Sequence, residues 1–236
     1  MKLLTFNILH GGGSRVADIC RVIEQHNADV IVLTEFRENA SGAEIKSRLG
    51  DCGWANQASS HPPPRTNGVL VLSKSAFTQE PAPDDVPGGS CRWIECDFQW
   101  FVLAGNYFPL NQLKIPHWEW FVRQASAKSS RPCVLMGDFN TGKHFIDETG
   151  ATFIGSEYLG QLEQLGFIDA WRHFQPEHRE YTWYSRANNG FRLDYAFASK
   201  ALALRLCRAW HSHAERELKV SDHSALLVEL DSPARD

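Results

Sequence analysis

The chain has 236 residues, of which 43% are hydrophobic and 22% are charged, and its formal net charge is −4. This balance is typical of a globular protein that buries a sizeable core, and we expect one domain over residues 1–236. The acidic net charge argues against a protein that binds nucleic acid through bulk positive charge.

Six cysteines are scattered along the chain without a CxxC pair. This spacing favours reduced cysteines in a cytosolic protein over a disulfide framework or a zinc site. No segment reaches the length of a membrane span, and the apolar run near the N-terminus is too short for a signal peptide. We therefore expect a cytoplasmic protein that does not interact with membranes.

The first half of the chain alternates between strand-like and helix-like patterns. Residues 1–7 predict a strand, and residues 14–27 carry apolar side chains at helical spacing. Residues 28–36 form a β-branched run that is typical of a fully buried strand. A helix is predicted at 115–128, and further strands are predicted at 67–73, 92–98, 100–108 and 132–140.

The second half of the chain is richer in strands. A short helix is predicted at 158–166 and a short extended segment at 167–172, followed by strands at 181–185, 191–199, 203–211 and 223–230. The order of elements near the start resembles the order around Asp138, which suggests two similar halves. We expect an α+β fold in which two mixed β-sheets pack face to face with helices outside.

Carboxylates, amides and one histidine recur where the predicted strands end. Side chains at i and i+2 of a strand point to the same face, so Asp138 and Asn140 should project together, as should Arg192 and Asp194. Taken singly, these pairs could instead form an Asx turn and a structural ion pair. The remaining strand-end residues are Asn7, Glu35, Asp222 and His223. Their number favours a ligand site at one end of the strands.

These residue types suit the hydrolysis of a phosphate ester. Glu35 offers the hard oxygen ligand that Mg²⁺ prefers. Asp138 can orient and deprotonate a water, and Asn140 can donate a hydrogen bond to a phosphate oxygen or to that water. His223 can stabilise charge in the transition state, and Asp194 can fix its tautomer.

Six motifs occur in order along the chain: LTFNILHG, DVIVLTEFR, NYFPLN, VLMGDFNTG, FRLDYAFAS and VSDH. With these motifs the chain resembles the endonuclease/exonuclease/phosphatase superfamily, and within it the branch of exonuclease III and the apurinic/apyrimidinic (AP) endonucleases. The resemblance implies a four-layered αββα sandwich. It also implies phosphodiesterase or phosphatase activity that depends on Mg²⁺, with Mn²⁺ as an alternative.

The resemblance also implies roles for individual residues. Asn7 and Glu35 match the metal site, Asp222 lies near a second metal position, and Tyr107 contacts the phosphate. Asp138 and Asn140 position the attacking water, while His223 contacts the phosphate with Asp194 as its partner. The substrate-binding positions are Trp183, Phe191, Leu193 and Arg192, and the first three match an apolar pocket for a flipped-out abasic sugar.

Two departures from the branch concern the metal and DNA. Leu9 stands where the branch usually places a polar residue close to the metal. The segments 61–67 and 142–150, which correspond to loops that grip DNA, are sparse in Lys and Arg, although affinity for DNA depends on neutralising phosphates.

We expect a monomeric, metal-dependent phosphodiesterase that acts on DNA in repair, as an AP endonuclease, a 3′ exonuclease or both. The alternative is the same chemistry on RNA, a nucleotide, an inositol phosphate or a lipid headgroup, which the acidic net charge favours. A third possibility is a binding module that keeps the fold without catalysis. The presence of the catalytic residue types disfavours this third interpretation.

Overall fold

The computed structural model describes residues 1–233 and contains two six-stranded sheets. The first sheet has the order β13-β14-β1-β2-β4-β3. Its strands are β1 (Lys2–Asn7), β2 (Val30–Phe36), β3 (Asn56–Ser59), β4 (Gly68–Ser73), β13 (Leu206–Ser212) and β14 (Ala225–Leu230).

The second sheet has the order β5-β6-β7-β8-β12-β9. Its strands are β5 (Thr78–Gln79), β6 (Trp93–Asp97), β7 (Val102–Tyr107), β8 (Cys133–Asp138), β9 (Ile168–Asp169) and β12 (Asp194–Ala198). In each sheet one central pair is parallel, β1 with β2 and β7 with β8, and the other pairs are antiparallel. The expected mixed sheets are therefore confirmed.

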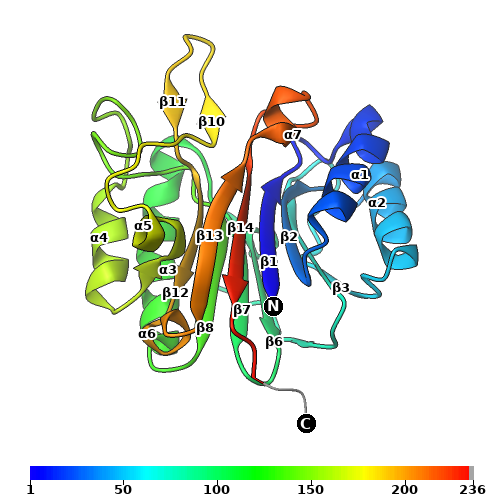
Figure 1. The fold of residues 1–236 in the computed structure, drawn as a ribbon, viewed down its shortest axis with the longest axis horizontal. Helices are drawn as coiled ribbons and strands as arrows, with labels where there is room; N and C mark the ends of the chain where they lie inside the picture. The colour runs from blue at the N-terminus through cyan, green and yellow to red at the C-terminus, as the bar shows by residue number, and fades with distance from the viewer. Residues whose placement is uncertain (234–236) are drawn as a thin grey trace.

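Helices cover the outer faces of both sheets (Figure 1). Helices α1 (Val16–His26) and α2 (Ala40–Asp51) pack on the first sheet, and α3 (Lys114–Lys128) and α4 (Glu157–Gln164) pack on the second. The shorter elements are α5 (Ala170–Phe174), α6 (Lys200–Ala203), α7 (Ala214–Glu217), η1 (Gly13–Arg15), η2 (Ser90–Arg92), η3 (Asn111–Leu113) and the hairpin of β10 (Trp183–Tyr184) and β11 (Gly190–Phe191).

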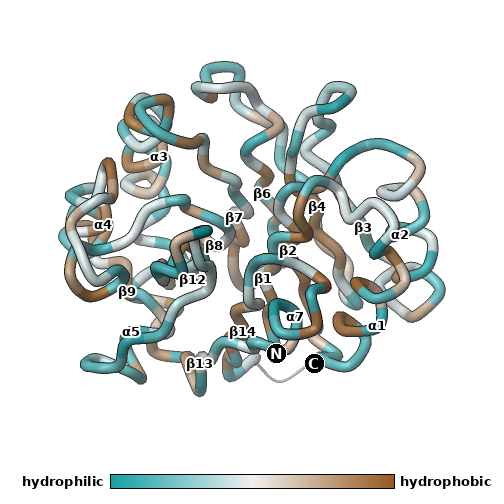
Figure 2. The backbone as a smooth tube through the Cα atoms, turned by 90° about the horizontal axis from the view of Figure 1, so that it is seen from above, coloured by the Kyte–Doolittle hydropathy of each residue, from teal (hydrophilic) through white to brown (hydrophobic). Residues whose placement is uncertain are grey.

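Three hydrophobic cores lie between the layers of the fold: one between the two sheets, one under α1 and α2, and one under α3 and α4. On β2, Val30 and Val32 belong to the core between the sheets, whereas Ile31 and Leu33 belong to the core under α1 and α2. Both faces of such a strand are buried, which explains its uninterrupted apolar sequence. Seen from above, the hydrophobic stretches of the central strands lie in the middle of the molecule (Figure 2). This is the αββα sandwich that the resemblance implied.

The structure corrects the prediction for residues 167–172, which were expected to be extended. Only Ile168–Asp169 is a strand, and a helical turn, α5, begins at Ala170. The Asp169 side chain accepts a hydrogen bond from the backbone N–H of Arg172 and so caps that turn. A buried carboxylate therefore ends the strand early.

The sequence patterns did not predict helix α2 or strand β3. Helix α2 buries only Gly42, Ile45 and Leu49, which is too narrow an apolar stripe to stand out in a polar sequence. Strand β3 is short and polar, with the sequence NQAS. Within residues 1–233, no helix combines the length and the apolar character that crossing a bilayer requires.

Candidate active site

Strand alternation brings distant polar residues to one end of the space between the sheets. Leu3 and Met136 belong to the core between the sheets, and Asn7 and Asp138 follow them on the same faces of β1 and β8. Asp194 begins β12 directly opposite Asp138 in the antiparallel register. These side chains therefore come from both sheets and meet where the strands end.

A β-bulge directs Glu35 to the same place. Regular alternation after Val32 and Leu33 would turn Glu35 toward the helices. The register of β2 with β4 shifts between Thr34 and Phe36, and Glu35 has a φ of 56°. Non-glycine residues rarely adopt a positive φ, and such residues cluster at functional sites. The bulge turns the carboxylate into the cleft.

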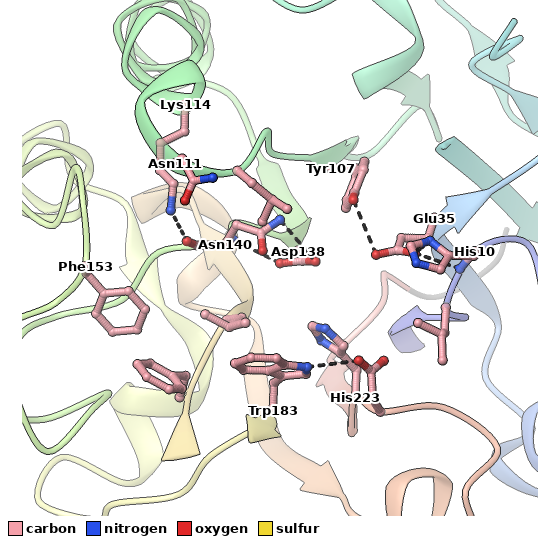
Figure 3. A pocket seen from close by; sticks show the side chains of 15 residues that line it. His10, Glu35, Tyr107, Asn111, Lys114, Asp138, Asn140, Phe153, Trp183 and His223 are labelled. Carbon is pink, nitrogen blue, oxygen red and sulfur yellow. Dashed lines mark hydrogen bonds and ion pairs between the residues drawn. The ribbon is translucent and has the colours of Figure 1, made fainter. Parts of the chain in front are cut away.

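The cleft between the strand ends has a volume of about 400 Å³ (Figure 3). One side carries polar and charged groups, and the other carries aromatic and aliphatic groups. It is lined by Leu9, His10, Glu35, Tyr107, Leu110, Asn111, Lys114, Asp138, Asn140, Phe153, Trp183, Phe191, Leu193, Asp222 and His223. Nine of the twelve residues expected at the site line this cleft. Asn7 lies behind them and contacts the carboxylate of Asp138. The two others, Asp194 and Arg192, are fully buried and do not line the cleft.

Asn7 bridges the carboxylates of the two sheets. Its Nδ2 donates to Glu35 Oε1 at 3.3 Å and to Asp138 Oδ2 at 3.0 Å. Its Oδ1 accepts the backbone N–H of Leu9 at 2.9 Å. The amide oxygen has one partner within the chain and keeps a second lone pair. Asn7 therefore orients the carboxylates and can also offer its oxygen to a cation.

Asn140 combines two of the interpretations that the sequence left open. Its backbone N–H donates to Asp138 Oδ1 at 2.9 Å, which is an Asx turn. Its Nδ2 donates to the Phe108 carbonyl at 2.9 Å and lies 3.4 Å from Asp138 Oδ2. Because both amide hydrogens have acceptors, the side-chain oxygen is the group left for a water, and it accepts rather than donates.

His223 and Asp194 form a buried pair. His223 Nδ1 lies 2.9 Å from Asp194 Oδ2, and both residues are at most 5% exposed. Burial lowers the pKa of His223, but the charge and the hydrogen bond of Asp194 outweigh it and raise the pKa to about 10. The imidazole is therefore a cation at neutral pH, and its Nε2 is left to donate to a bound anion.

The site concentrates negative charge in a place with little water. Burial raises the pKa of Asp138 to about 7, and Asp194 and Glu35 add to the shift while His223 opposes it. Asp194 Oδ1 is buried without a hydrogen-bond partner. A set of buried oxygen donors with excess negative charge fits a divalent cation.

Two sets of residues at the site offer ligand atoms for a cation. Among residues 1–233, Asp138, Asp194 and His223 are the one group of three whose ligand atoms lie close enough to share an ion. His223 Nδ1 and Asp194 Oδ2 are already paired with each other at 2.9 Å, however. Glu35 is the better donor, because Tyr107 Oη and Asn7 contact its Oε1 only at 3.3 Å.

Asp222 lies at the edge of the cleft. Its carboxylate is exposed and accepts the indole N–H of Trp183 at 2.9 Å. It does not join Glu35 in a cluster of ligands. Asp222 therefore keeps the expected place near the site, but in this structure its partner is the aromatic wall.

The opposite wall of the cleft is apolar. The rings of Trp183 and Phe191 lie 5.7 Å apart, and Phe153 packs edge to face against Phe191 with centroids 5.5 Å apart. Leu193 adds an aliphatic surface next to them. The three residues expected in an apolar pocket thus all line the cleft, and Figure 3 shows Trp183 and Phe153 on this wall.

The family model of the Endonuclease/Exonuclease/phosphatase family matches residues 4–223. The chain belongs to this family. Two curated relatives agree with the branch that the motifs indicate. One is a DNA-(apurinic or apyrimidinic site) endonuclease of Dictyostelium discoideum, 27% identical over 86% of this chain and 63% of the relative. The other is Recombination repair protein 1 of Drosophila melanogaster, 29% identical over 46% of this chain and 20% of the relative. The chain thus spans less than two thirds of each relative.

Solved structures share the fold of this family member. The 3′ phosphatase NExo from Neisseria, bound to a product DNA hairpin, superposes with a TM-score of 0.86 and 21% identity over 98% of this chain and 100% of NExo. An AP endonuclease from Archaeoglobus fulgidus gives a TM-score of 0.82 and 20% identity over the same shares. At these identities the match establishes the fold.

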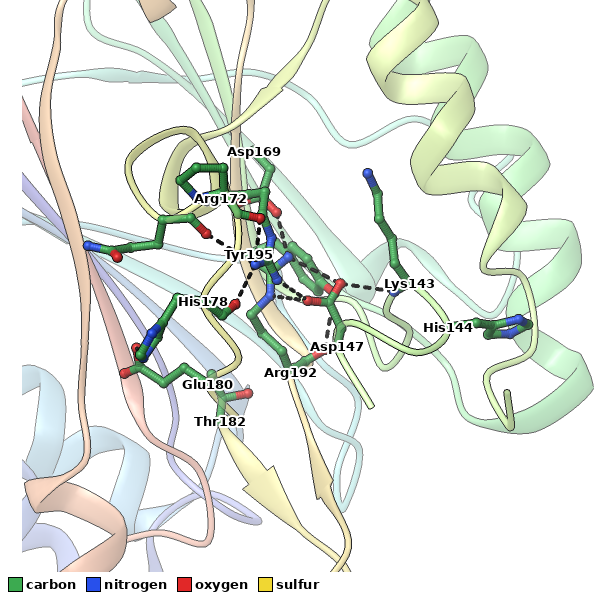
Figure 4. A network of polar contacts seen from close by, with 12 residues as sticks. Lys143, His144, Asp147, Asp169, Arg172, His178, Glu180, Thr182, Arg192 and Tyr195 are labelled. Carbon is green, nitrogen blue, oxygen red and sulfur yellow. Dashed lines mark hydrogen bonds and ion pairs between the residues drawn. The ribbon is translucent and has the colours of Figure 1, made fainter. Parts of the chain in front are cut away.

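Arg192, which we expected to bind substrate, does not line the cleft of this family member. Its side chain is fully buried, with Nε 2.7 Å from Asp147 Oδ1 and Nη2 2.6 Å from Asp169 Oδ2 (Figure 4). The alternation rule fails because Arg192 lies between β11 and β12, outside both strands. Asp194 can therefore contact His223 while Arg192 contacts Asp147 in the loop 142–150.

Several residues of the cleft were not predicted to be functional. Lys114 begins α3, is 5% exposed and donates through Nζ to the Asn140 carbonyl; burial lowers its pKa to about 8. His10 lies in the loop after β1, and Phe153 lies in the loop before α4. None of them ends a strand, so the pattern that located the other residues does not reach them.

Proposed function

We propose that this chain is a divalent-metal-dependent phosphodiesterase that acts on DNA. Its substrates would be abasic sites, in the manner of an AP endonuclease, or 3′ termini, in the manner of a 3′ exonuclease or 3′ phosphatase. The cation would be Mg²⁺ or Mn²⁺. The chain would work as a monomer.

One observation carries the proposal. A polar centre suited to phosphate and an apolar wall lie side by side in one cleft. The wall of Trp183, Phe191 and Leu193 offers no hydrogen-bonding edge for a base apart from the indole N–H, which Asp222 already binds. Such a surface suits a sugar without a base better than an intact nucleotide. The functions of the relatives described above support the same substrate class.

The chain's own residues support hydrolysis by an attacking water. Asp138 would accept a proton from the water, while the side-chain oxygen of Asn140 accepts a second hydrogen bond and holds it in line. His223 Nε2 and the hydroxyl of Tyr107 would donate to phosphate oxygens as charge develops there. Tyr107 stays protonated as a donor because burial and the charges of Glu35 and Asp138 raise its pKa.

Glu35 would hold the cation, with Asn7 keeping its carboxylate in place. When bound, the cation supplies Lewis-acid polarisation of the phosphate and stabilises the leaving oxygen. Lys114 adds a positive charge next to Asn140 and Asp138. This charge would attract the phosphate into the cleft.

The acidic net charge of −4 favours a second candidate. Tight binding of duplex DNA releases counterions from many phosphates, which requires several Lys and Arg. A nucleotide or another small phosphate ester needs only the groups inside the cleft. The same metallophosphoesterase chemistry on a small ester is therefore the alternative.

The test compares three substrates at fixed cation concentration: a duplex with one abasic-site analogue, a duplex with a 3′-phosphate end, and a mononucleotide. We expect cation-dependent incision at the abasic site or removal of the 3′ group, and loss of both with EDTA. Turnover of the mononucleotide alone would replace DNA by the second candidate.

The matched variants are Asp138→Asn and Asp18→Asn. Both remove one carboxylate charge, but Asp18 forms an exposed ion pair with Arg21 on α1. We expect Asp138→Asn to abolish turnover and Asp18→Asn to leave it unchanged. Normal rates in Asp138→Asn would overturn the assignment of the base.

A further inference from the structure

The loop after β1 has an unusual backbone. Five consecutive residues, Leu9 to Gly13, all have positive φ, and the first two are not glycines. Left-handed backbone at non-glycine residues is held only where the surrounding structure determines it. Here Arg15 donates through Nη2 to the carbonyl of Leu9 at 2.6 Å, and the backbone N–H of Gly11 donates to the carbonyl of Glu35 at 2.8 Å. The loop is therefore anchored beside Glu35.

The loop sets His10 against the carboxylate of Glu35 (Figure 3). The backbone N–H of His10 donates to Glu35 Oε2 at 2.7 Å, and the ring nitrogen Nδ1 lies 2.8 Å from the same oxygen. The His10 side chain is 63% exposed and that of Glu35 is 11% exposed. An ion in solvent can therefore reach both atoms.

Asn67 bears on whether His10 Nδ1 carries a hydrogen or a lone pair. Arg37 Nε donates to Asn67 Oδ1 at 2.6 Å, which fixes the orientation of the amide. The other end of the amide, Nδ2, is a donor and lies 3.4 Å from His10 Nδ1. In the tautomer in which Nδ1 accepts from Asn67, its lone pair stands beside the carboxylate oxygen; in the other tautomer Nδ1–H donates to that oxygen.

Two lone pairs at this separation match adjacent ligands of one ion. Ligands about 2.1 Å from a metal at right angles to each other lie about 3 Å apart. The distance of 2.8 Å between Nδ1 and Oε2 is close to that value. An imidazole ligand suits first-row transition metals such as Fe²⁺, Ni²⁺ and Zn²⁺, whereas Mg²⁺ prefers oxygen alone; Mn²⁺ also favours oxygen ligands, which makes it the most demanding probe of a nitrogen ligand.

We propose that His10 Nδ1 is a ligand of the same cation that Glu35 holds, so that this site selects a transition-metal ion over Mg²⁺. The inference rests on the proposed function for the existence of the cation. Remaining positions would be filled by water or phosphate oxygens.

The experiment measures metal ligation directly. Mn²⁺ is bound to the full chain, and pulsed electron paramagnetic resonance records coupling to the ¹⁴N nucleus of imidazole. Calorimetry gives the affinities for Mn²⁺ and Mg²⁺. We expect nitrogen coupling in the wild type, its loss in His10→Ala, and a fall in Mn²⁺ affinity of about 10-fold or more with a smaller fall for Mg²⁺.

Two further variants make the result specific. His61 is also an exposed histidine with a positive φ, 50° against 54° for His10, so His61→Ala is the matched control and should change nothing. His10→Asn keeps a residue that tolerates left-handed backbone and replaces nitrogen by an amide oxygen. It should lose the coupling and reduce the preference for Mn²⁺ over Mg²⁺.

Three results would overturn the inference. They are Mn²⁺ bound to the wild type without nitrogen coupling, coupling that persists in His10→Ala, and a rise in both affinities in His10→Ala, which would make His10 a competitor of the cation for Glu35. The substrate assays remain independent. Coupling without cleavage would count against the proposed function alone, and cleavage without coupling would count against the His10 ligand alone.

Discussion

At the scale of single residues, the pKa values of Asp138 and His223 are shifted from their ordinary values. The pKa of Asp138 is raised to about 7 and that of His223 to about 10. Between these values the carboxylate is charged and can take a proton, while the imidazole is charged and can donate. A base and an acid thus coexist above neutral pH because burial and Asp194 shift both groups.

We expect kcat/KM to rise up to about pH 7 and to fall near pH 10. A bound cation favours the charged carboxylate, so the acidic limb would move below 7 at saturating metal. Asp194→Asn removes the charge that keeps His223 protonated. It should move the alkaline limb to lower pH and reduce kcat by about 10²-fold, the scale of one lost transition-state donor. A pH–rate profile of both proteins measures this, and an alkaline limb that stays near 10 in Asp194→Asn would refute the role of Asp194.

Arg192 leads to a prediction about stability. It is fully buried between Asp147 and Asp169, and its guanidinium lies 4.1 Å from the centre of the Tyr195 ring. Removing one partner of a buried ion pair leaves an uncompensated charge, which costs about 3–5 kcal/mol. Arg192→Ala should therefore lower the free energy of unfolding by that amount in urea denaturation.

The matched control is Arg21→Ala, because Arg21 pairs with Asp18 on the surface with both side chains more than half exposed. Exposed pairs contribute about 0–1 kcal/mol. Equal losses in the two variants would mean that the buried network around Arg192 does not hold the loop 142–150 in place.

At the scale of elements, the parallel pairing of β7 with β8 positions Tyr107 next to Asp138. Gly137 precedes Asp138 with a φ of 148°, and a Cβ there would lie 1.9 Å from the backbone oxygen of Asn106. The neighbouring backbone cannot move away without disturbing the parallel pairing. The glycine therefore allows the two strands to bring both side chains to the cleft.

We expect Gly137→Ala to destabilise the protein by about 2 kcal/mol or more and to lower kcat, because Asp138 would shift. Gly160→Ala is the control. Gly160 lies in α4 and a Cβ there meets nothing within 4 Å, so alanine should stabilise the helix by up to about 1 kcal/mol. Thermal unfolding of the two variants and of the wild type compares them. A stable and active Gly137→Ala protein would contradict the close approach of the strands.

At the scale of the whole molecule, the two sheets bring like charges together. Glu35 and Asp222 come from the side of the first sheet, and Asp138 and Asp194 come from the second. Packing the sheets therefore places carboxylates close to one another in the absence of a cation. A ligand that binds the folded state alone stabilises it by mass action.

We expect a divalent cation at 100 times its Kd to stabilise the wild type by about 2.7 kcal/mol, seen as a rise in Tm that EDTA reverses. Glu35→Gln should remove most of this rise. Glu44→Gln should keep it, since Glu44 is paired with Arg48 on the surface of α2. The same rise in Glu35→Gln as in the wild type would move the cation away from Glu35.

The sequence by itself determined the parts of this protein that depend on local patterns. Strands buried on both faces are continuous apolar runs, so β1, β2, β7, β8 and β14 could be recognised. Polar residues at the ends of those runs pointed to Asn7, Glu35, Asp138 and His223, because a core strand has no structural need to end in such groups. The order of motifs then indicated the family, which the comparison confirms.

Only the tertiary structure decided the features that depend on distant partners. Arg192 meets Asp147 and Asp169, which lie 45 and 23 residues away, and no spacing rule relates them. The orientation of Asn140 follows from the carbonyl of Phe108, and the place of His10 follows from a left-handed loop that faces Glu35 and Asn67. Periodicity fixes the face of a strand on which a side chain lies, but the packing of two sheets determines which side chains meet across it.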